Sequence, residues 1–343
     1  MEVRPCRPDE VGALQAFIAE TWRADHVLAH DEDLLRWQFG GLVGSDAPTV
    51  VLAVADDGTV LGMQGVIEAP LTIHGRTVRA AWLANLMASP EGRAQGAGMK
   101  LLWASFKMGY DVLLSLGVNA DMRATLPSLR YEILDPLPRW AAVVDAAAPT
   151  GTGAGPVAVE PVDRLDDEWD RVWDLDLAPS LVGTRRDARF LTWRYLAHPT
   201  FTYAVRLARR RGAAVGLAVH RVEAAGATGP PAVRLVELVG DPEARSALLA
   251  DVVDTARSAG APLVDWYGTA PYDDELRTAG FVPVEAGGPV PSRFSPLVPH
   301  DVPFAGAFRA QAKHTGLVGR FLSAPGLHLT KGDGDMDRPN IVP

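Results

Sequence analysis

The sequence predicts an α/β or α+β fold that is divided into two domains. At 343 residues the chain exceeds the usual size of one compact domain and would fill two domains of about 150 residues each. Its composition is that of a globular protein, with 48% hydrophobic and 22% charged residues, and 33 glycines and 27 prolines favour many turns over long helical bundles. The order of predicted elements in the first half also returns in the second half.

The first half begins with a strand and a helix. Residues 3–5 read as a short strand, and Pro8 opens an amphipathic helix whose apolar residues recur with the helical period at Val11, Leu14, Phe17 and Ile18. Further strands are predicted at residues 49–54, 60–67, 71–73, 80–88 and 112–118, and further helices at about residues 96–108 and 121–129.

Residues 146–156 separate the two halves. Their sequence, AAAPTGTGAGP, has no apolar period and is rich in turn-forming residues, so it reads as a linker or an exposed loop. We therefore expect a first domain at residues 1–145 and a second domain, with a C-terminal extension, at residues 157–343.

Four sequence matches indicate that the second half repeats the first. Residues 31–39 and 187–195 share Asp, Leu, Trp and a final aromatic residue in register, at an offset of 156 residues (187 − 31). Three more pairs follow in the same order, with offsets that fall from 154 to 150 residues: 60–62 with 214–216, 86–90 with 238–242, and 130–131 with 280–281. A tandem duplication with trimmed loops explains this drift. The two Asp-to-Trp segments read as helix-packing elements rather than ligand contacts.

Charge and cysteine content exclude several functions. The formal net charge is -9 and the basic residues are spread along the chain, so no nucleic-acid partner is expected. The sequence contains no signal-peptide core and no apolar stretch of about 18 to 20 residues, which predicts a cytoplasmic protein without a membrane partner. Cys6 is the only cysteine and reads as a bystander. Asp333, Asp335 and Asp337 lack the following Glu of a calcium loop, so no metal is expected.

The most informative segment is residues 84–102, where a predicted buried strand ends in a glycine-rich turn that opens an apolar helix. The backbone N–H groups of such a turn and of the helix start point into one small volume and favour a pyrophosphate there. Gly96 and Gly98 have no Cβ, so phosphates can approach the main chain, and Arg93 can add a charge-assisted contact. The segment therefore predicts a phosphate-binding loop.

This segment resembles the GNAT (Gcn5-related N-acetyltransferase) superfamily, whose signature Arg/Gln-x-x-Gly-x-Gly/Ala is met by residues 93–98. The resemblance implies that each half is a mixed, mostly antiparallel sheet flanked by helices, and that acetyl-CoA or a longer acyl-CoA is the co-substrate. In this fold the strands before and after the loop splay apart, and pantetheine lies in the wedge between them. The resemblance implies these cofactor-binding residues: Leu86, Met87, Ala88, Arg93, Ala94, Gln95, Gly96, Ala97, Gly98 and Met99.

The catalytic residues of the family are only partly matched. A Tyr that many members use to protonate the thiolate would fall at Leu126, and the strand position that often carries Glu holds Asn85. The catalytic candidates are therefore Asn85, Asn119, which could instead cap a turn, and Asp121, the preferred base, which could instead cap a helix. Other substitutes for the base are His30 and Asp33.

The second half departs further from the family pattern. Its predicted strand at residues 233–239 runs into residues 240–243, Gly-Asp-Pro-Glu, where neither loop glycine is kept and two acids would repel a pyrophosphate. Coenzyme A binding is therefore expected in the first half alone, and the second half is expected to supply substrate contacts across the domain cleft. Its aromatic and imidazole groups could stack on a base or a sugar, and the expected substrate-binding residues are Trp193, Tyr195, His198, Trp266 and Tyr267.

The chain as a whole resembles bacterial acyltransferases that modify nucleotide-linked amino sugars, through its Asp-to-Trp segments, its tandem layout and its ending at residues 329–339. That resemblance implies direct attack of a primary amine on acyl-CoA in a ternary complex, within a monomer or a homodimer. A second possibility is an acetyltransferase similar to mycothiol synthase, acting on a cysteinyl glucosamine precursor. The third is a non-catalytic acyl-CoA-sensing module, since the usual Tyr and Glu are missing.

Overall fold

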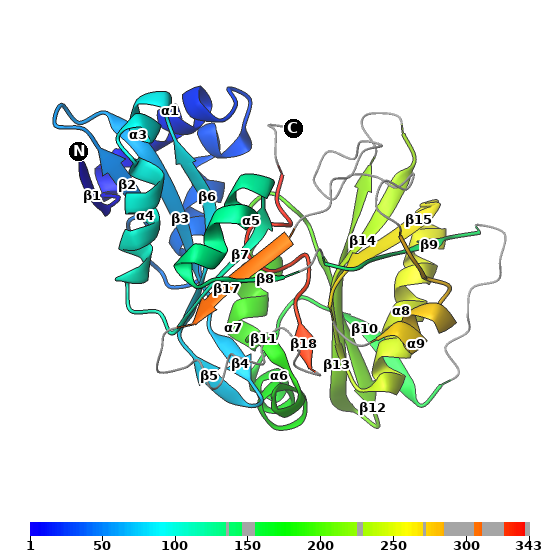
Figure 1. Cartoon of the computed structure of the whole chain (residues 1–343). Helices are drawn as coiled ribbons and strands as arrows, with labels where there is room; N and C mark the ends of the chain where they lie inside the picture. Colours follow the sequence, from blue (N-terminus) through cyan, green and yellow to red (C-terminus); the bar gives the residue numbers. More distant parts are fainter. Residues whose placement is uncertain are drawn as a thin grey trace.

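The computed structural model describes residues 1–134, 137–145, 155–224, 229–269, 272–284, 305–310 and 326–339. Two lobes are each built on a sheet, and the C-terminal segment runs between them (Figure 1). Residues 146–154 of the expected linker lie outside the described ranges. None of the helices within these ranges has both the length and the apolar character that a membrane span requires.

The helices are short except for α1, α4 and α8. Their bounds are α1 (Val11–Thr21), α2 (Glu32–Arg36), α3 (Pro90–Ala94), α4 (Ala97–Phe106), α5 (Ala120–Thr125), α6 (Asp167–Val172), α7 (Ala188–Leu191), α8 (Pro242–Ser258) and α9 (Asp273–Thr278). The helix predicted at residues 121–129 is divided in two, because α5 ends at Thr125 and a 3₁₀ turn follows at Leu126–Leu129.

The first lobe contains the first sheet. In the described ranges its strands lie in the order β1 (Glu2–Pro5), β2 (Val50–Val54), β3 (Val60–Glu68), β6 (Ala80–Ala88), β7 (Val112–Val118), β17 (Ala305–Ala310) and β8 (Glu132–Leu134). Neighbouring strands are antiparallel except β6 and β7, which are parallel. The loop between these two parallel strands carries α3 and α4, so the predicted phosphate-binding turn lies at the end of β6.

The second lobe repeats this layout. Its described strands lie in the order β10 (Val157–Val162), β12 (Ala204–Arg210), β13 (Ala213–Ala224), β14 (Pro231–Gly240), β15 (Leu263–Tyr267), β9 (Arg139–Val143) and β16 (Val282–Pro283). Here β14 and β15 form the parallel pair, and α8 connects them. The predicted fold class, mixed and mostly antiparallel sheets flanked by helices, is confirmed.

Each lobe receives one strand from the other half of the sequence. β9 follows β8 along the chain but lies between β15 and β16, where Trp140 and Ala142 join the core of the second lobe. β17 takes the equivalent place in the first sheet, between β7 and β8. The predicted boundary after residue 145 therefore does not separate the two sheets, because strand pairing crosses it in both directions.

Further contacts join the lobes. A small third sheet has the order β18 (Leu327–His328), β11 (Val182–Thr184), β4 (Leu71–Ile73) and β5 (Arg76–Val78). The largest hydrophobic core also spans both halves, with Trp82 from the first and Trp173 and Leu191 from the second. Smaller cores lie beneath α4 and α8. Apolar burial therefore fixes one lobe against the other.

The two Asp-to-Trp segments meet where the lobes touch. Trp37 Nε1 donates to the main-chain oxygen of Trp193 at 3.0 Å, and Trp193 Nε1 donates to the main-chain oxygen of Trp37 at 3.1 Å. Asp31 and Asp187 cap α2 and α7, each by accepting a main-chain N–H at 2.8 Å. The exchange of equivalent hydrogen bonds shows that the two segments are related by a pseudo-twofold axis and pack against each other.

Candidate active site

A cavity of about 890 Å³ opens where β6 and β7 separate. The two strands pair over only three residues each, 80–82 and 112–114, and beyond this point both strands line the cavity. Main-chain N–H and C=O groups need partners, and a strand edge without a neighbouring strand can offer them to a bound molecule. The wedge between β6 and β7 is therefore the candidate ligand site.

β6 carries a β-bulge inside this cavity. Its pairing with β3 changes register between Met63 and Gly65, and Asn85 takes a left-handed conformation with a φ of 54°. Gln64 holds the bulge from the neighbouring strand, since its Nε2 donates to Ala84 O at 2.8 Å. Asn85 and Gln64 both line the cavity. A bulge re-aims the side chains around it, and this one presents two amides to a ligand.

The turn before α4 has the geometry of an anion site. Gly96 turns the chain into the helix with a φ of 73°, a conformation that favours glycine. As the N-cap residue it has no side chain that could bind the N–H groups of the first turn. A Cβ added at Gly98 would project into open space. Arg93, whose Nε donates to Ala88 O at 3.0 Å, also lines the cavity and adds a positive charge.

The predicted cofactor-binding residues fall into two groups. Those that line the cavity are Leu86, Met87, Ala88, Arg93, Gly96, Gly98 and Met99. Of the others, Ala97 is buried in the core beneath α4, whereas Ala94 and Gln95 lie on the exposed surface. Contact with an acyl-CoA stays a prediction for all ten residues.

The three predicted catalytic residues line the same cavity from different elements. Asn85 lies on β6, whereas Asn119 and Asp121 are exposed residues at the start of α5. Asn119 Oδ1 accepts the main-chain N–H of Met122 at 2.9 Å and caps α5, so the capping alternative holds for this residue. Asp121 is therefore not the N-cap, and its carboxylate lies in the first turn of α5.

Tyr131 adds a phenol to the cavity, although in the sequence it was notable only as an aromatic residue of the repeat. It is 4% exposed and lines the cavity together with Leu126, the position at which the family Tyr was expected. Within the described ranges its hydroxyl has no hydrogen-bond partner, and burial raises the pKa of Tyr131 above its usual range. The hydroxyl is therefore protonated at neutral pH, and its oxygen is covered by protein atoms.

The C-terminal segment also enters the cavity, which the sequence did not predict. Asp335, Met336 and Arg338 line the cavity. Asp335 Oδ2 accepts a hydrogen bond from Asn85 Nδ2 at 3.3 Å and lies 3.4 Å from Arg338 Nε. The charged residues of this segment alternate with the period of a strand, but residues 331–338 form turns and bends. Its alternating aspartates were the one signal, and they pointed only to a calcium loop that the sequence already excluded.

Arg338 is held in place by groups from the first lobe. Its Nη1 lies 3.2 Å from His26 Nε2, and its guanidinium carbon lies 5.3 Å from the ring centre of Trp22. Burial and the charge of Arg338 lower the pKa of His26 to about 3, so the ring is neutral. Its Nδ1 accepts the main-chain N–H of Leu28 at 3.2 Å. Trp22 is 43% exposed and lines the cavity, which leaves an indole surface for a ligand.

The predicted substrate-binding residues do not line the cavity. All five are buried, with at most 9% exposure: Trp193, Tyr195, His198, Trp266 and Tyr267. Trp193 stacks on Trp37 with ring centres 5.0 Å apart, and Trp266 belongs to the core beneath α8. Trp193 also lines a second pocket, next to Trp37, and substrate binding stays a prediction for all five residues.

No metal cluster is found in the described part of the chain, where no three His, Cys, Asp or Glu side chains are grouped for an ion. Asp333 and Asp337 instead form ion pairs with Arg186 at 2.9 Å and with Arg221 at 3.1 Å. These buried carboxylates therefore act within the protein's own charge network.

The sequence matches no family model and no curated protein, but the fold matches solved structures. A GCN5-related N-acetyltransferase from Anabaena variabilis has a TM-score of 0.63 at 12% identity, and a probable N-acyltransferase from Enterococcus faecalis has 0.61 at 14%. Each match covers 90% of this chain and 72% of the other. For a GCN5-related N-acetyltransferase from Kribbella flavida the TM-score is 0.60 at 18% identity, with 90% and 70% covered. Along 90% of its length, this chain has the fold of GCN5-related N-acetyltransferases.

Proposed function

We propose that this protein is an acyl-CoA-dependent N-acyltransferase that moves an acyl group to a primary amine. The observation that carries the proposal is the open wedge between β6 and β7, with the uncapped start of α4 among its walls. A pyrophosphate is favoured there, because the free N–H groups, the helix dipole and Arg93 all attract an anion. The pantetheine arm would then extend along β6 and bring the thioester towards Asn85.

Acyl transfer from such a thioester requires little chemistry from the protein. The amine must be neutral and aligned with the carbonyl carbon, and the developing oxyanion needs hydrogen-bond donors. A thiol has an ordinary pKa of about 8.5, so the leaving thiolate can take a proton from solvent.

For the acceptor, we propose an amino sugar, in its nucleotide-linked form as the first choice. The exposed indole of Trp22 can pack against a pyranose ring, while Gln64, Asn85 and Asp335 in the same cavity can bind hydroxyl and amino groups. A cysteinyl glucosamine precursor also carries a sugar and a primary amine, so these side chains suit both acceptors. The choice between them needs a substrate panel.

The test measures release of free thiol from acetyl-CoA and longer acyl-CoAs with nucleotide-linked amino sugars, free glucosamine and cysteinyl glucosamine. Gly98→Glu places a carboxylate in the proposed phosphate site without occupying space that the protein fills. We expect it to weaken coenzyme A binding by about 100-fold or more, an effect of roughly 3 kcal/mol. Gly12→Glu is the matched control, because Gly12 is also the second residue of an exposed helix start with open space around it.

The outcomes separate the proposed functions. Release that depends on a nucleotide-linked sugar and is lost in Gly98→Glu would support the first proposal. Release with cysteinyl glucosamine alone would favour the activity similar to mycothiol synthase. Coenzyme A binding without release for any amine would contradict catalysis and support an acyl-CoA-sensing module.

A further inference from the structure

The C-terminal segment occupies the second lobe's counterpart of the wedge. β14 and β15 are parallel and pair over only three residues, as β6 and β7 do. Past this pairing, Lys331 N–H donates to Tyr267 O at 3.2 Å, and Thr269 N–H donates to Leu329 O at 3.0 Å. In the second lobe, the end of the chain itself therefore binds main-chain groups at the place where the first lobe has its cavity.

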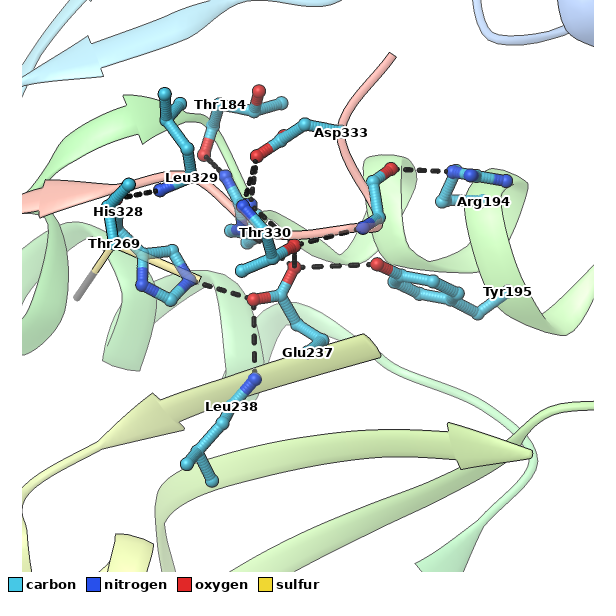
Figure 2. Close-up of polar contacts among 12 residues, drawn as sticks. Thr184, Arg194, Tyr195, Glu237, Leu238, Thr269, His328, Leu329, Thr330 and Asp333 are labelled. Carbon is cyan, nitrogen blue, oxygen red and sulfur yellow. Dashed lines mark hydrogen bonds and ion pairs between the residues drawn. The ribbon is translucent and has the colours of Figure 1, made fainter. Parts of the chain in front are cut away.

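Glu237 anchors this segment from β14. The 152-residue offset of the repeat aligns Glu237 with Asn85 (237 − 85). Figure 2 shows His328, Thr330 and Tyr195 converging on the Glu237 carboxylate. His328 Nε2 lies 2.7 Å from Oε1, and the Tyr195 hydroxyl donates to Oε2 at 3.4 Å. Glu237 is therefore the counterpart of Asn85 in the repeat, and its carboxylate binds the C-terminal segment.

Two carboxylates of the segment itself are fixed by arginines of the second lobe. Arg186 donates to Asp333 at 2.9 Å and to Glu237 at 2.8 Å, and all three side chains are fully buried. Burial alone would raise the pKa of Glu237, but the charge of Arg186 lowers it to about 2. Arg221 donates to Asp337 at 3.1 Å. The residues on both sides of position 335 are thus held by buried ion pairs.

Asp335 lies between these two anchored residues and lines the first-lobe cavity. Its side chain is 13% exposed, and its Oδ2 is the atom that meets Asn85 Nδ2 and Arg338 Nε. In the described part of the chain both contacts go to Oδ2, which leaves Oδ1 without a protein partner. The carboxylate is therefore oriented by two donors, and one of its oxygens is available to a ligand in the wedge.

Resting on the N-acyltransferase function proposed above, we propose that Asp335 is the catalytic carboxylate that binds the acceptor's ammonium group and removes its proton. Asn85 and Arg338 are positioning residues, and the second lobe holds the segment that carries Asp335. Asp335 is better placed than the exposed Asp121, because partial burial strengthens its attraction for a cation. This arrangement also explains why Asn85 replaces the expected Glu, since the carboxylate arrives from the C-terminal segment.

The proton and bond changes balance without another reactant. The acceptor ammonium gives one proton to Asp335 Oδ1, which later releases it to water. The freed lone pair forms a C–N bond with the thioester carbonyl carbon, and collapse of the tetrahedral intermediate breaks the C–S bond. The second nitrogen proton leaves as the thiolate becomes the coenzyme A thiol. The products are an amide, the free thiol and one proton in solution.

The test compares Asp335→Asn with the parent protein. Asparagine keeps the size of the side chain and an oxygen that accepts hydrogen bonds. Titration calorimetry measures coenzyme A affinity, and thiol release from acetyl-CoA measures kcat/KM with the same amine panel. We expect kcat/KM to fall by about 100-fold or more, the usual effect of losing a general base, with coenzyme A affinity unchanged within about threefold. Asp163→Asn, an exposed carboxylate outside the cavity, should change neither quantity.

Four outcomes would overturn the assignment. Turnover by Asp335→Asn within about threefold of the parent would remove the role of Asp335 and leave the N-acyltransferase function in place. Loss of turnover in Asp121→Asn but not in Asp335→Asn would transfer the role to Asp121. An equal loss of coenzyme A affinity and turnover in Asp335→Asn would make the residue structural. No release by the parent with any amine would remove the proposed function itself, and the role of Asp335 with it.

Discussion

The two lobes share a parallel strand pair that opens into a wedge, but they differ in the helical segment that follows the first strand of the pair. In the first lobe this segment is divided into α3, which Ser89 caps by accepting the N–H of Gly92 at 3.0 Å, and α4, whose N-cap Gly96 offers no side chain to its free N–H groups. In the second lobe Asp241 aligns with Ser89 (241 − 152) and caps α8 by accepting the N–H of Ala244 at 2.9 Å. Because α8 then runs unbroken to Ser258, the described part of the second lobe has no counterpart of the open helix start at Gly96.

The difference continues inside the wedge. The first lobe keeps a cavity of about 890 Å³, and the second lobe places the C-terminal segment at the corresponding strands. The second wedge therefore differs from the first in two ways, because its helix is unbroken and the C-terminal segment lies against its strands. The following predictions test how far this contrast holds.

The largest effect on stability is expected at the buried ion pairs that hold the C-terminal segment in the second lobe. Arg186→Met leaves Glu237 and Asp333 buried without their shared cation. Breaking a buried ion pair by removing one partner typically costs about 3 to 5 kcal/mol, and we expect a loss of this size in the free energy of unfolding. Equilibrium urea denaturation measures the loss.

Arg210→Met is the matched control, because Arg210 also bridges two carboxylates, Asp241 and Glu243, but at the surface. Exposed pairs contribute little to stability, so this variant should remain close to the parent. If the two variants lost the same free energy, the buried network would not be what holds the C-terminal segment.

Coenzyme A should bind once per chain, although the fold contains two wedges. The open helix start at Gly96 in the first lobe can take the pyrophosphate, whereas in the second lobe α8 is unbroken and the C-terminal segment lies in the wedge. Titration calorimetry should give a stoichiometry of one, and ligand at 100 times Kd should stabilise the native state by about 2.7 kcal/mol. A stoichiometry of two would show that the second wedge also binds coenzyme A, and it would contradict the proposed difference between the lobes.

Gly332→Ala tests how closely the segment packs against the second lobe. A Cβ at this position would overlap the hydroxyl of Tyr195, which donates to Glu237. Overpacking of a close-packed site typically destabilises by about 1 to 3 kcal/mol, and thermal unfolding should show a loss in this range. Gly12→Ala, at an open position in α1, should instead be neutral or slightly stabilising. A neutral Gly332→Ala would mean that the segment is loosely held.

The sequence contained the local features of the site but not its long-range ones. Residues 93–98 predicted a glycine turn that opens a helix, and the structure has this turn at Gly96, the N-cap of α4. The repeat placed Trp37 and Trp193 in register, and the structure brings them into contact. Asp335 gave no such signal. Its place in the cavity depends on how residues 326–339 pack against the second lobe, and the local sequence pattern does not reveal that packing.

The strand exchange was also beyond local reasoning. β9 and β17 follow β8 and β16 along the chain, and either sheet could accept an apolar strand at its edge. Pairing partners of strands far apart in sequence are set by the whole core, such as the burial of Trp140 in the second lobe. The aromatic residues of the second half were predicted to bind substrate from their composition, and composition alone does not reveal that they are buried.

The smallest effect concerns a position where the repeat itself differs. His198 corresponds to Leu42 (198 − 156) and lies against Trp37, with ring centres 4.2 Å apart. Burial, assisted by the charge of Arg194, lowers the pKa of His198 to about 3, so below about pH 6.5 the unfolded state binds a proton that the native state does not. This group therefore lowers stability as pH falls from about 6.5 towards 3. At pH 5.5 the loss relative to pH 7 is about 1.3 kcal/mol.

His198→Asn should remove this loss and keep the local turn. Asparagine can still accept the main-chain N–H groups of Thr200 and Phe201, which His198 Nδ1 accepts at 3.1 and 2.9 Å. Urea denaturation of parent and variant at pH 7 and pH 5.5 should show a smaller pH-dependent loss in the variant, by about 1.3 kcal/mol. His74→Asn, at an exposed left-handed turn that asparagine tolerates, is the control for the substitution itself. Equal pH dependence in the parent and in His198→Asn would mean that the ring between the lobes takes up a proton in the native state, and the contact would then have to be open to solvent.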